Sequence, residues 1–129
     1  MSEQDLALQQ FIKALAAFEE AIANDDGDKK SRDSLLLSYV FTFEMACRSL
    51  KTTLEKKGLD TPNYGSAILK AAFQARLITD AVFWETLRDY RNNVSHAYDE
   101  GKAIEIAAFV GTQSVPYFKQ LLAELQRDA

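Results

Sequence analysis

The sequence is poor in residues that interrupt helices, cross-link chains or span membranes. It has two prolines, five glycines and one cysteine in 129 residues. Cys47 therefore has no partner for an internal disulfide, and its apolar neighbours indicate a small buried hydrophobe in a reducing compartment. The sequence has neither a basic start followed by an apolar stretch nor a run of about 18 apolar residues, so we expect a cytoplasmic protein without a signal peptide or membrane span.

The chain also has fewer basic than acidic residues, 15 against 19. The net charge is −4, which argues against the broad basic surface of a DNA-binding domain but leaves room for a local basic cleft. The apolar content of 47% is that of an ordinary globular protein, and the length suits one domain over residues 1–129. We interpret the short basic clusters as solvated helix surface: Lys29-Lys30-Ser31-Arg32, Arg48 with Lys51, Lys56-Lys57, and Arg88 near Arg91.

The spacing of apolar residues predicts two long helices in the first half of the chain. Apolar side chains recur every three or four positions over residues 3–23, which predicts an amphipathic helix. A second helix should run from Asp28 or Ser31 to Lys57, with Gly58 as its C-terminal stop. This second helix is apolar on more than one side, so we expect it to be central or to lie at an interface.

Three further helices are predicted in the second half. A short third helix is expected over residues 66–74, and a fourth follows Thr79 or Asp80 as its cap. A fifth begins after Asp99, with a kink or break over residues 113–116, where a proline removes a backbone donor. The fold class is therefore all-α, an antiparallel up-and-down bundle of about five helices. The core stripe of the fifth helix is expected at Ile104, Ala108, Gly111, Val115, Phe118, Leu122 and Leu125.

Glu44 is a carboxylate inside the apolar run of the second helix. Burying it without a partner would be costly. Arg48 lies one turn later and is the favoured ion-pair partner. The alternative is that Glu44 faces a cleft that contains Arg91 and His96 and orients one of them.

One short segment concentrates the residues that can carry chemistry. Arg91-Asn92-Asn93-Val94-Ser95-His96-Ala97-Tyr98 holds the only histidine of the chain together with an arginine and a tyrosine. A histidine can gain or lose a proton near neutral pH, and a guanidinium offers a planar fork of donors to a phosphate or a phosphorane. The pair therefore suits phosphodiester chemistry.

Helical geometry limits how this pair can meet. In a regular helix His96 would lie about 140° around the axis from Arg91, because each residue turns the helix by about 100°. The two converge only if the helix ends or loosens near Ser95, or if a second copy of the chain supplies its own pair. Tyr98 stays near the site in either case. On spacing alone, a solvated or ion-paired Arg91 and a helix-terminal His96 are the simpler interpretation.

The same segment resembles a family signature. Arg91, Asn92, His96 and Tyr98 are similar to the Arg-x4-His-x-Tyr signature of the HEPN family, small helical proteins that include metal-independent ribonucleases. The run that ends at Glu100 resembles most closely the branch named as nucleotidyltransferase substrate-binding proteins. The similarity covers about residues 6 to 125, and two other stretches agree with it: Phe41-Thr42-Phe43-Glu44 followed by Lys51, and Ala72-Phe73 through Leu77-Ile78 to Trp84.

The resemblance implies a HEPN-like four-helix bundle with a short additional helix, and a homodimer in which two copies of the motif line one groove. In a ribonuclease of this kind His96 would act as general base on the RNA 2′-hydroxyl or as acid on the leaving oxygen, and Arg91 would stabilise charge on the phosphorane. Asn92 and Ser95 would hold the phosphate or position the histidine, or are ordinary helix-end residues. We expect no cofactor and no metal site, since one histidine and one cysteine make no convincing set of ligands.

The resemblance also implies a protein partner. Relatives of this type are encoded beside a minimal nucleotidyltransferase, which in toxin–antitoxin pairs transfers AMP to the tyrosine that Tyr98 matches. AMP there would add charge and bulk beside Arg91 and block RNA; alternatively, the ring of Tyr98 covers the core. The expected function is an endoribonuclease toxin neutralised by this transfer. The alternatives are a noncatalytic subunit that binds substrate or nucleotide for the transferase, and a dimeric scaffold without activity.

Overall fold

The chain folds into helices only, as predicted. The computed structural model describes residues 1–128, and these form six α-helices and one 3-10 turn. The predicted fifth helix is two helices, which accounts for the difference from the five expected. The elements are α1 (Glu3–Ala23), α2 (Lys29–Lys56), α3 (Gly65–Gln74), α4 (Ala81–Asn93), η1 (Val94–His96), α5 (Glu100–Gln113) and α6 (Val115–Asp128).

Side-chain caps explain where most of these helices begin. Ser2, Asp28, Asp80 and Asp99 each accept a hydrogen bond from a backbone N–H in the first turn of α1, α2, α4 and α5, respectively. Helix α2 is followed by Gly58, whose φ of 84° lies in the left-handed region that glycine adopts without steric cost. With Asp28 and Asp80 as the caps, the predicted starts of the five helices agree with the structure to within one residue.

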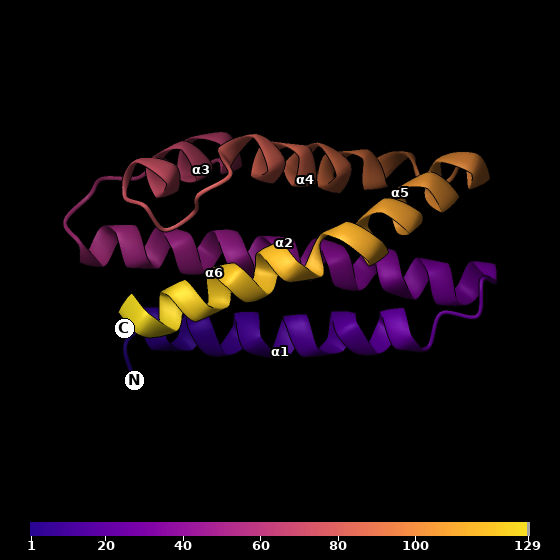
Figure 1. Ribbon diagram of the computed structural model, residues 1–129, viewed down its shortest axis with the longest axis horizontal. Coiled ribbons are helices and arrows are strands. Elements are labelled where there is room, and N and C mark those ends of the chain that lie inside the picture. Colours follow the sequence, from indigo (N-terminus) through magenta and orange to yellow (C-terminus); the bar gives the residue numbers. More distant parts are fainter. Residues whose placement is uncertain (129) are drawn as a thin grey trace.

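The predicted break in the last helix is at Ser114. Its hydroxyl donates to the carbonyl of Val110 at 2.5 Å, and Pro116 lies in the first turn of α6, where a missing N–H is tolerated. The chain changes direction between α5 and α6 at this point (Figure 1). Part of the predicted core stripe is wrong, because its spacing was carried unchanged through the predicted break, whereas α5 and α6 each face the core in their own register. Ile104 and Ala108 are exposed, and the buried positions of α5 are Ala103, Ile106, Ala107 and Val110.

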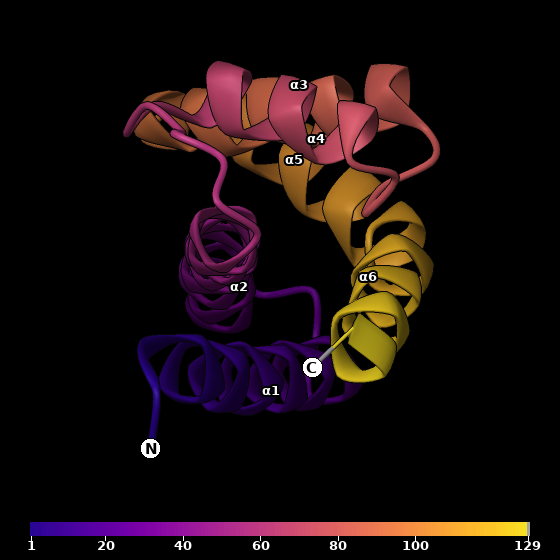
Figure 2. The same ribbon diagram turned by 90° about the vertical axis from the view of Figure 1, so that its left-hand side faces the viewer.

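Helix α2 is the element against which the other five α-helices pack. Viewed end-on, α1 lies below it, α3 and α4 lie above it, and α6 lies to its right (Figure 2). Of the two predicted positions, central or at an interface, the structure shows the central one. None of the described helices lies over its remaining side (Figure 2). Leu37 and Phe41 of α2 are 60% and 53% exposed.

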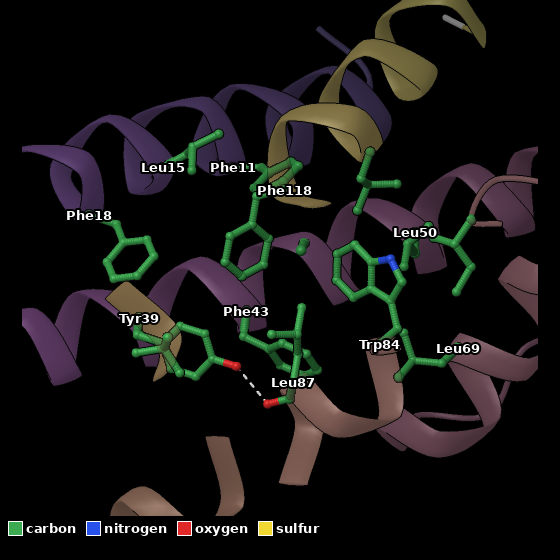
Figure 3. Packing of buried hydrophobic residues seen from close by; sticks show 14 of the residues in the cluster. Phe11, Leu15, Phe18, Tyr39, Phe43, Leu50, Leu69, Trp84, Leu87 and Phe118 are labelled. Atoms are coloured by element: carbon green, nitrogen blue, oxygen red, sulfur yellow. Dashed lines mark hydrogen bonds between the residues drawn. The ribbon is translucent and has the colours of Figure 1, made fainter. Parts of the chain in front are cut away.

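Aromatic side chains from four helices meet in the core. The ring of Phe118 on α6 lies 6.1 Å from Phe11, 6.2 Å from Phe18, 6.1 Å from Tyr39 and 5.7 Å from Trp84 (Figure 3). All five side chains are buried. Trp84 is 2% exposed and is more deeply buried than its neighbour Phe83.

A buried hydrogen bond attaches α4 to α2. The hydroxyl of Tyr39 donates to the carbonyl oxygen of Leu87 at 2.6 Å (Figure 3). Burial raises the pKa of Tyr39 far above its usual value, so the hydroxyl keeps its proton at neutral pH. This bond thereby fixes the position of the turn before the Arg91 motif along the axis of α2.

In the described part of the chain, no helix combines the length and the apolar character needed to cross a bilayer.

We expect Phe118→Ala to lower the free energy of unfolding by about 3–5 kcal/mol, because it removes a fully buried ring and leaves a cavity among four aromatic neighbours. Urea denaturation followed by far-ultraviolet circular dichroism measures the change. Phe73→Ala is the matched control, since Phe73 is 48% exposed, and it should change stability by less than about 1 kcal/mol. Equal losses in the two variants would contradict the core described above.

Candidate functional site

The Arg91 to Tyr98 motif spans the end of α4 and the turn that follows it. Helix α4 ends at Asn93 and tightens into the 3-10 turn η1. Two side chains bond back to the backbone at this point: Asn93 donates to the carbonyl of Asp89, and Ser95 donates to the carbonyl of Asn92. Such bonds compete with regular helical pairing. The α-helix thus ends before Ser95, which is one of the conditions under which Arg91 and His96 can approach each other.

Arg91 is held by Glu44. Its Nη2 donates to the Oε1 of Glu44 at 2.5 Å, and the two side chains are 36% and 40% exposed. The predicted ion pair of Glu44 with Arg48 is wrong: Arg48 donates to the Oε1 of Gln10 at 3.1 Å instead. The packing of α4 on α2 brings the guanidinium of Arg91 to Glu44, whereas the equivalent group of Arg48 turns to α1. The alternative prediction, that Glu44 faces a cleft with Arg91 and His96, agrees with the structure for Arg91 but not for His96, which does not line the pocket beside Glu44.

A pocket of about 430 Å³ opens beside this ion pair, between α2, α4 and the start of α3; we call it the α2–α4 pocket. Asn92 and Asn63 lie at its wall, and Phe43, Cys47 and Ile68 give it an apolar floor. Among its described lining residues are four cationic side chains and one carboxylate: Arg48, Lys51, Arg88, Arg91 and Glu44.

Cys47 lines this pocket but is not a nucleophile. Burial raises the pKa of its thiol to about 12, and the nearby Arg88 and Arg91 only partly oppose this effect. The thiol therefore stays protonated at neutral pH, whereas nucleophilic attack requires the thiolate. The prediction of a small hydrophobe holds in part, since the residue is only half-buried.

The remaining motif residues lie at the surface. His96 is exposed, and its ring meets the ring of Tyr98 edge-on with a centroid distance of 6.3 Å. Tyr98 is 87% exposed, so the alternative in which its ring covers the core is wrong. Ser95 bonds within its own turn, as a helix-end residue does, while Asn92 reaches the pocket.

One chain alone does not bring Arg91 and His96 together. Within residues 1–128 no hydrogen bond joins them, and His96 is not among the residues that line the α2–α4 pocket. The catalytic pair expected from the motif therefore needs a second copy of the chain or a ligand that spans both side chains.

The cationic lining of the pocket was missed by sequence reasoning, which took Arg48, Lys51 and Arg88 for solvated surface. A signal was present in the spacing. Arg88 and Arg91 are three residues apart and share a face of α4, and Lys51 lies seven residues after Glu44 on one face of α2. What the sequence does not reveal is that the two faces oppose each other.

A second pocket, of about 340 Å³, lies between α2 and α5 and contains none of the motif residues. Metal ligands do not gather anywhere in the described residues, where no three histidine, cysteine, aspartate or glutamate side chains form a cluster. The α2–α4 pocket and the adjoining motif are thus the candidate site.

The all-helical fold and the Arg-x4-His-x-Tyr segment at the end of α4 define a small helical protein of the HEPN class. The comparison with known families agrees: residues 6–127 match the family described as nucleotidyltransferase substrate binding protein like, and the chain belongs to this family. The predicted resemblance is therefore confirmed.

One curated relative is a protein of Haemophilus influenzae named probable ribonuclease HepT. It is 32% identical to this chain over 74 residues. The matched stretch covers 54% of this chain and 51% of the relative, so the similarity spans about half the length of each.

Proposed function

We propose that this protein is a metal-independent endoribonuclease that acts as a homodimer and is silenced by a nucleotidyltransferase partner. The observation that carries the proposal is the arrangement of Arg91, which Glu44 holds at the rim of a cationic pocket, with the exposed imidazole of His96 on the adjoining turn. The ribonuclease name of the Haemophilus relative supports the proposed activity, and the family description supports the proposed nucleotidyltransferase partner.

The proposed reaction is attack of an RNA 2′-oxygen on the neighbouring phosphorus. His96 of one copy removes the proton of the 2′-hydroxyl, and His96 of the second copy protonates the departing 5′-oxygen. The new P–O2′ bond replaces the P–O5′ bond, which leaves a 2′,3′-cyclic phosphate and a 5′-hydroxyl. Arg91 donates to the phosphorane oxygens, and Glu44 fixes the guanidinium so that it need not reorganise as charge develops.

The homodimer is supported by an uncovered apolar patch next to the motif. Leu37 and Val40 of α2 line a shallow depression together with Val94 and Ala97 of the motif segment, and Phe41 lies one turn after Leu37. We call these five residues the motif-side patch. A twofold contact through it would place the two motifs side by side, because an isologous interface pairs the same surface of both copies.

The second candidate is a noncatalytic subunit that binds substrate or nucleotide for the transferase. The size of the α2–α4 pocket favours it, because small-molecule sites typically enclose about 300–1,000 Å³. RNA cleavage separates the two candidates.

Purified protein incubated with cellular RNA in EDTA should cleave it. We expect Arg91→Ala to lower the cleavage rate by about 10²–10³-fold and His96→Ala by about 10²–10⁴-fold, because each removes a group that acts on the transition state. Glu44→Gln should have a smaller effect on the rate, since it keeps a hydrogen bond to Arg91 but loses the charge. Arg127→Ala, on exposed α6 surface, is the charge-matched control and should cleave normally. RNA that stays intact with the unaltered protein would favour the noncatalytic subunit.

We expect Leu37→Glu combined with Phe41→Glu to convert a dimer into monomers and to abolish cleavage. Both side chains are more than half exposed, so the charges disturb an interface and not the core. Light scattering coupled to size-exclusion chromatography measures the mass in solution. Phe73→Glu, on the exposed side of α3, is the matched control and should remain dimeric. A monomeric unaltered protein that cleaves RNA would contradict the shared groove.

Co-expression with an active nucleotidyltransferase encoded beside this gene should add one AMP to each chain. Tyr98 is the expected acceptor, because its side chain is 87% exposed and its hydroxyl is open to a second protein. Intact-mass spectrometry detects the addition, and Tyr98→Phe should remove it. Tyr64→Phe is the control, since Tyr64 is 63% exposed and lies outside the motif. A mass gain that persists in Tyr98→Phe would show that another residue is modified.

A further inference from the structure

The cleavage reaction leaves three cations of the α2–α4 pocket without a role. Arg91 contacts the phosphate that reacts, but Arg48, Lys51 and Arg88 lie further along the same pocket. We propose that these three side chains bind the phosphate group of a ribonucleotide next to the bond that is cleaved. The inference rests on the proposed function, because RNA is taken as the ligand that fills the pocket.

The charge of the pocket favours a phosphate. The whole chain carries a net charge of −4, yet the described lining residues of this pocket include four cations and a single carboxylate. That carboxylate, Glu44, is already bonded to Arg91. The excess of positive charge therefore falls on Arg48, Lys51 and Arg88, and phosphate contacts of this kind supply most of the affinity for a nucleic-acid strand.

The present partners of these cations leave them free to bind a ligand. The ammonium of Lys51 donates to the carbonyl of Thr61 at 2.6 Å and lies 3.4 Å from a carboxylate oxygen of Glu55, so one of its three N–H donors remains for a ligand. Arg88 meets Glu85 only at 3.7 Å, and its side chain is 31% exposed. A long contact at a partly solvated site contributes little, so a doubly bonded phosphate can replace it.

The start of α3 adds backbone donors to the same pocket. Tyr64 precedes this ten-residue helix and gives it no side-chain cap, unlike the residues that precede α1, α2, α4 and α5. Gly65 lines the pocket at this point, and a Cβ there would lie 3.2 Å from the Nε of Arg88. The glycine thus lets Arg88 rest against the helix start, where the N–H groups and the helix dipole also attract an anion.

Position along the helices identifies this phosphate as a neighbour of the one that reacts. Arg88 lies one turn before Arg91 on α4, whereas His96 lies beyond Arg91 in the opposite direction. Arg48 and Lys51 follow Glu44 along α2, which is antiparallel to α4. A strand that meets His96 and Arg91 in turn reaches Arg88 and Lys51 next, and the apolar floor of Phe43 and Ile68 accommodates its ribose or base.

The test measures binding of a fluorescent oligoribonucleotide whose 2′-hydroxyls are methylated, so that it cannot be cleaved. Fluorescence anisotropy gives the dissociation constant at several salt concentrations for the unaltered protein and for Arg48→Gln with Arg88→Gln. We expect the double variant to bind at least about tenfold more weakly, because a charged hydrogen bond is lost at each position. The slope of log affinity against log salt should fall by about 0.7 for each phosphate contact removed.

Lys13→Gln with Lys119→Gln is the charge-matched control, because both lysines lie on exposed surface of α1 and α6 away from the pocket. It should keep both the affinity and the salt slope of the unaltered protein. Arg48→Gln alone is measured as well, since Arg48 is exposed and its replacement leaves the core intact. Thermal melts that match across the variants confirm that all of them are folded.

Two further results separate this inference from the proposed function. Unchanged RNA affinity and salt slope in Arg48→Gln with Arg88→Gln would overturn the inference, even if cleavage that depends on Arg91 and His96 supports the nuclease. Calorimetry with ATP and AMP tests a free nucleotide as the source of the phosphate. Nucleotide binding that requires Arg48 and Arg88, in a protein that leaves RNA intact, would support the phosphate site but overturn the nuclease.

Discussion

The attachment of α4 to α2 is the constraint on which the rest of the site depends. Tyr39 donates to the carbonyl of Leu87 inside the core, and one turn further along α4 the guanidinium of Arg91 reaches Glu44. The first bond is buried and sets the height of α4 along α2. The second is partly exposed, and the position of α4 that the first bond sets determines where Arg91 lies relative to Glu44. Because α4 is fixed in this register, the pocket, the ion pair and the turn that carries His96 lie on the same side of the molecule.

The uncovered side of α2 divides into two halves of different character. Leu37 and Phe41 make its first half apolar, and Arg48 and Lys51 make its second half cationic, with Glu44 between them. A protein with a net charge of −4 can hold a polyanion only if its cations are gathered in one place. This division reconciles the acidic composition with the proposed RNA substrate, since the proposed dimer contact uses the apolar half and the proposed phosphate site uses the cationic half.

Features that depend on neighbouring residues were predictable from the sequence, and those that depend on distant ones were not. Capping residues such as Asp28 and Asp80 act within one turn, so the helix boundaries were correct. The partner of Glu44 was wrong because Arg91 is 47 residues away and becomes its neighbour only through the packing of α4. The core stripe of the fifth helix failed at Ile104 for a related reason: a break turns the two halves to face the core independently. The family was identified correctly from the motif, but the cationic lining of the adjoining pocket was not predicted.

The ion pair of Glu44 and Arg91 serves orientation more than stability. Pairs at partly exposed sites typically contribute about 0–1 kcal/mol, whereas a buried ring such as Phe118 contributes several times as much. The fold can therefore lose this pair and remain intact. A guanidinium carries five N–H donors, and the bond to Glu44 uses one of them while it restricts the plane of the others. An arginine held in this way presents the remaining donors to a phosphate without first losing conformational freedom, which is the condition for selective stabilisation of a transition state.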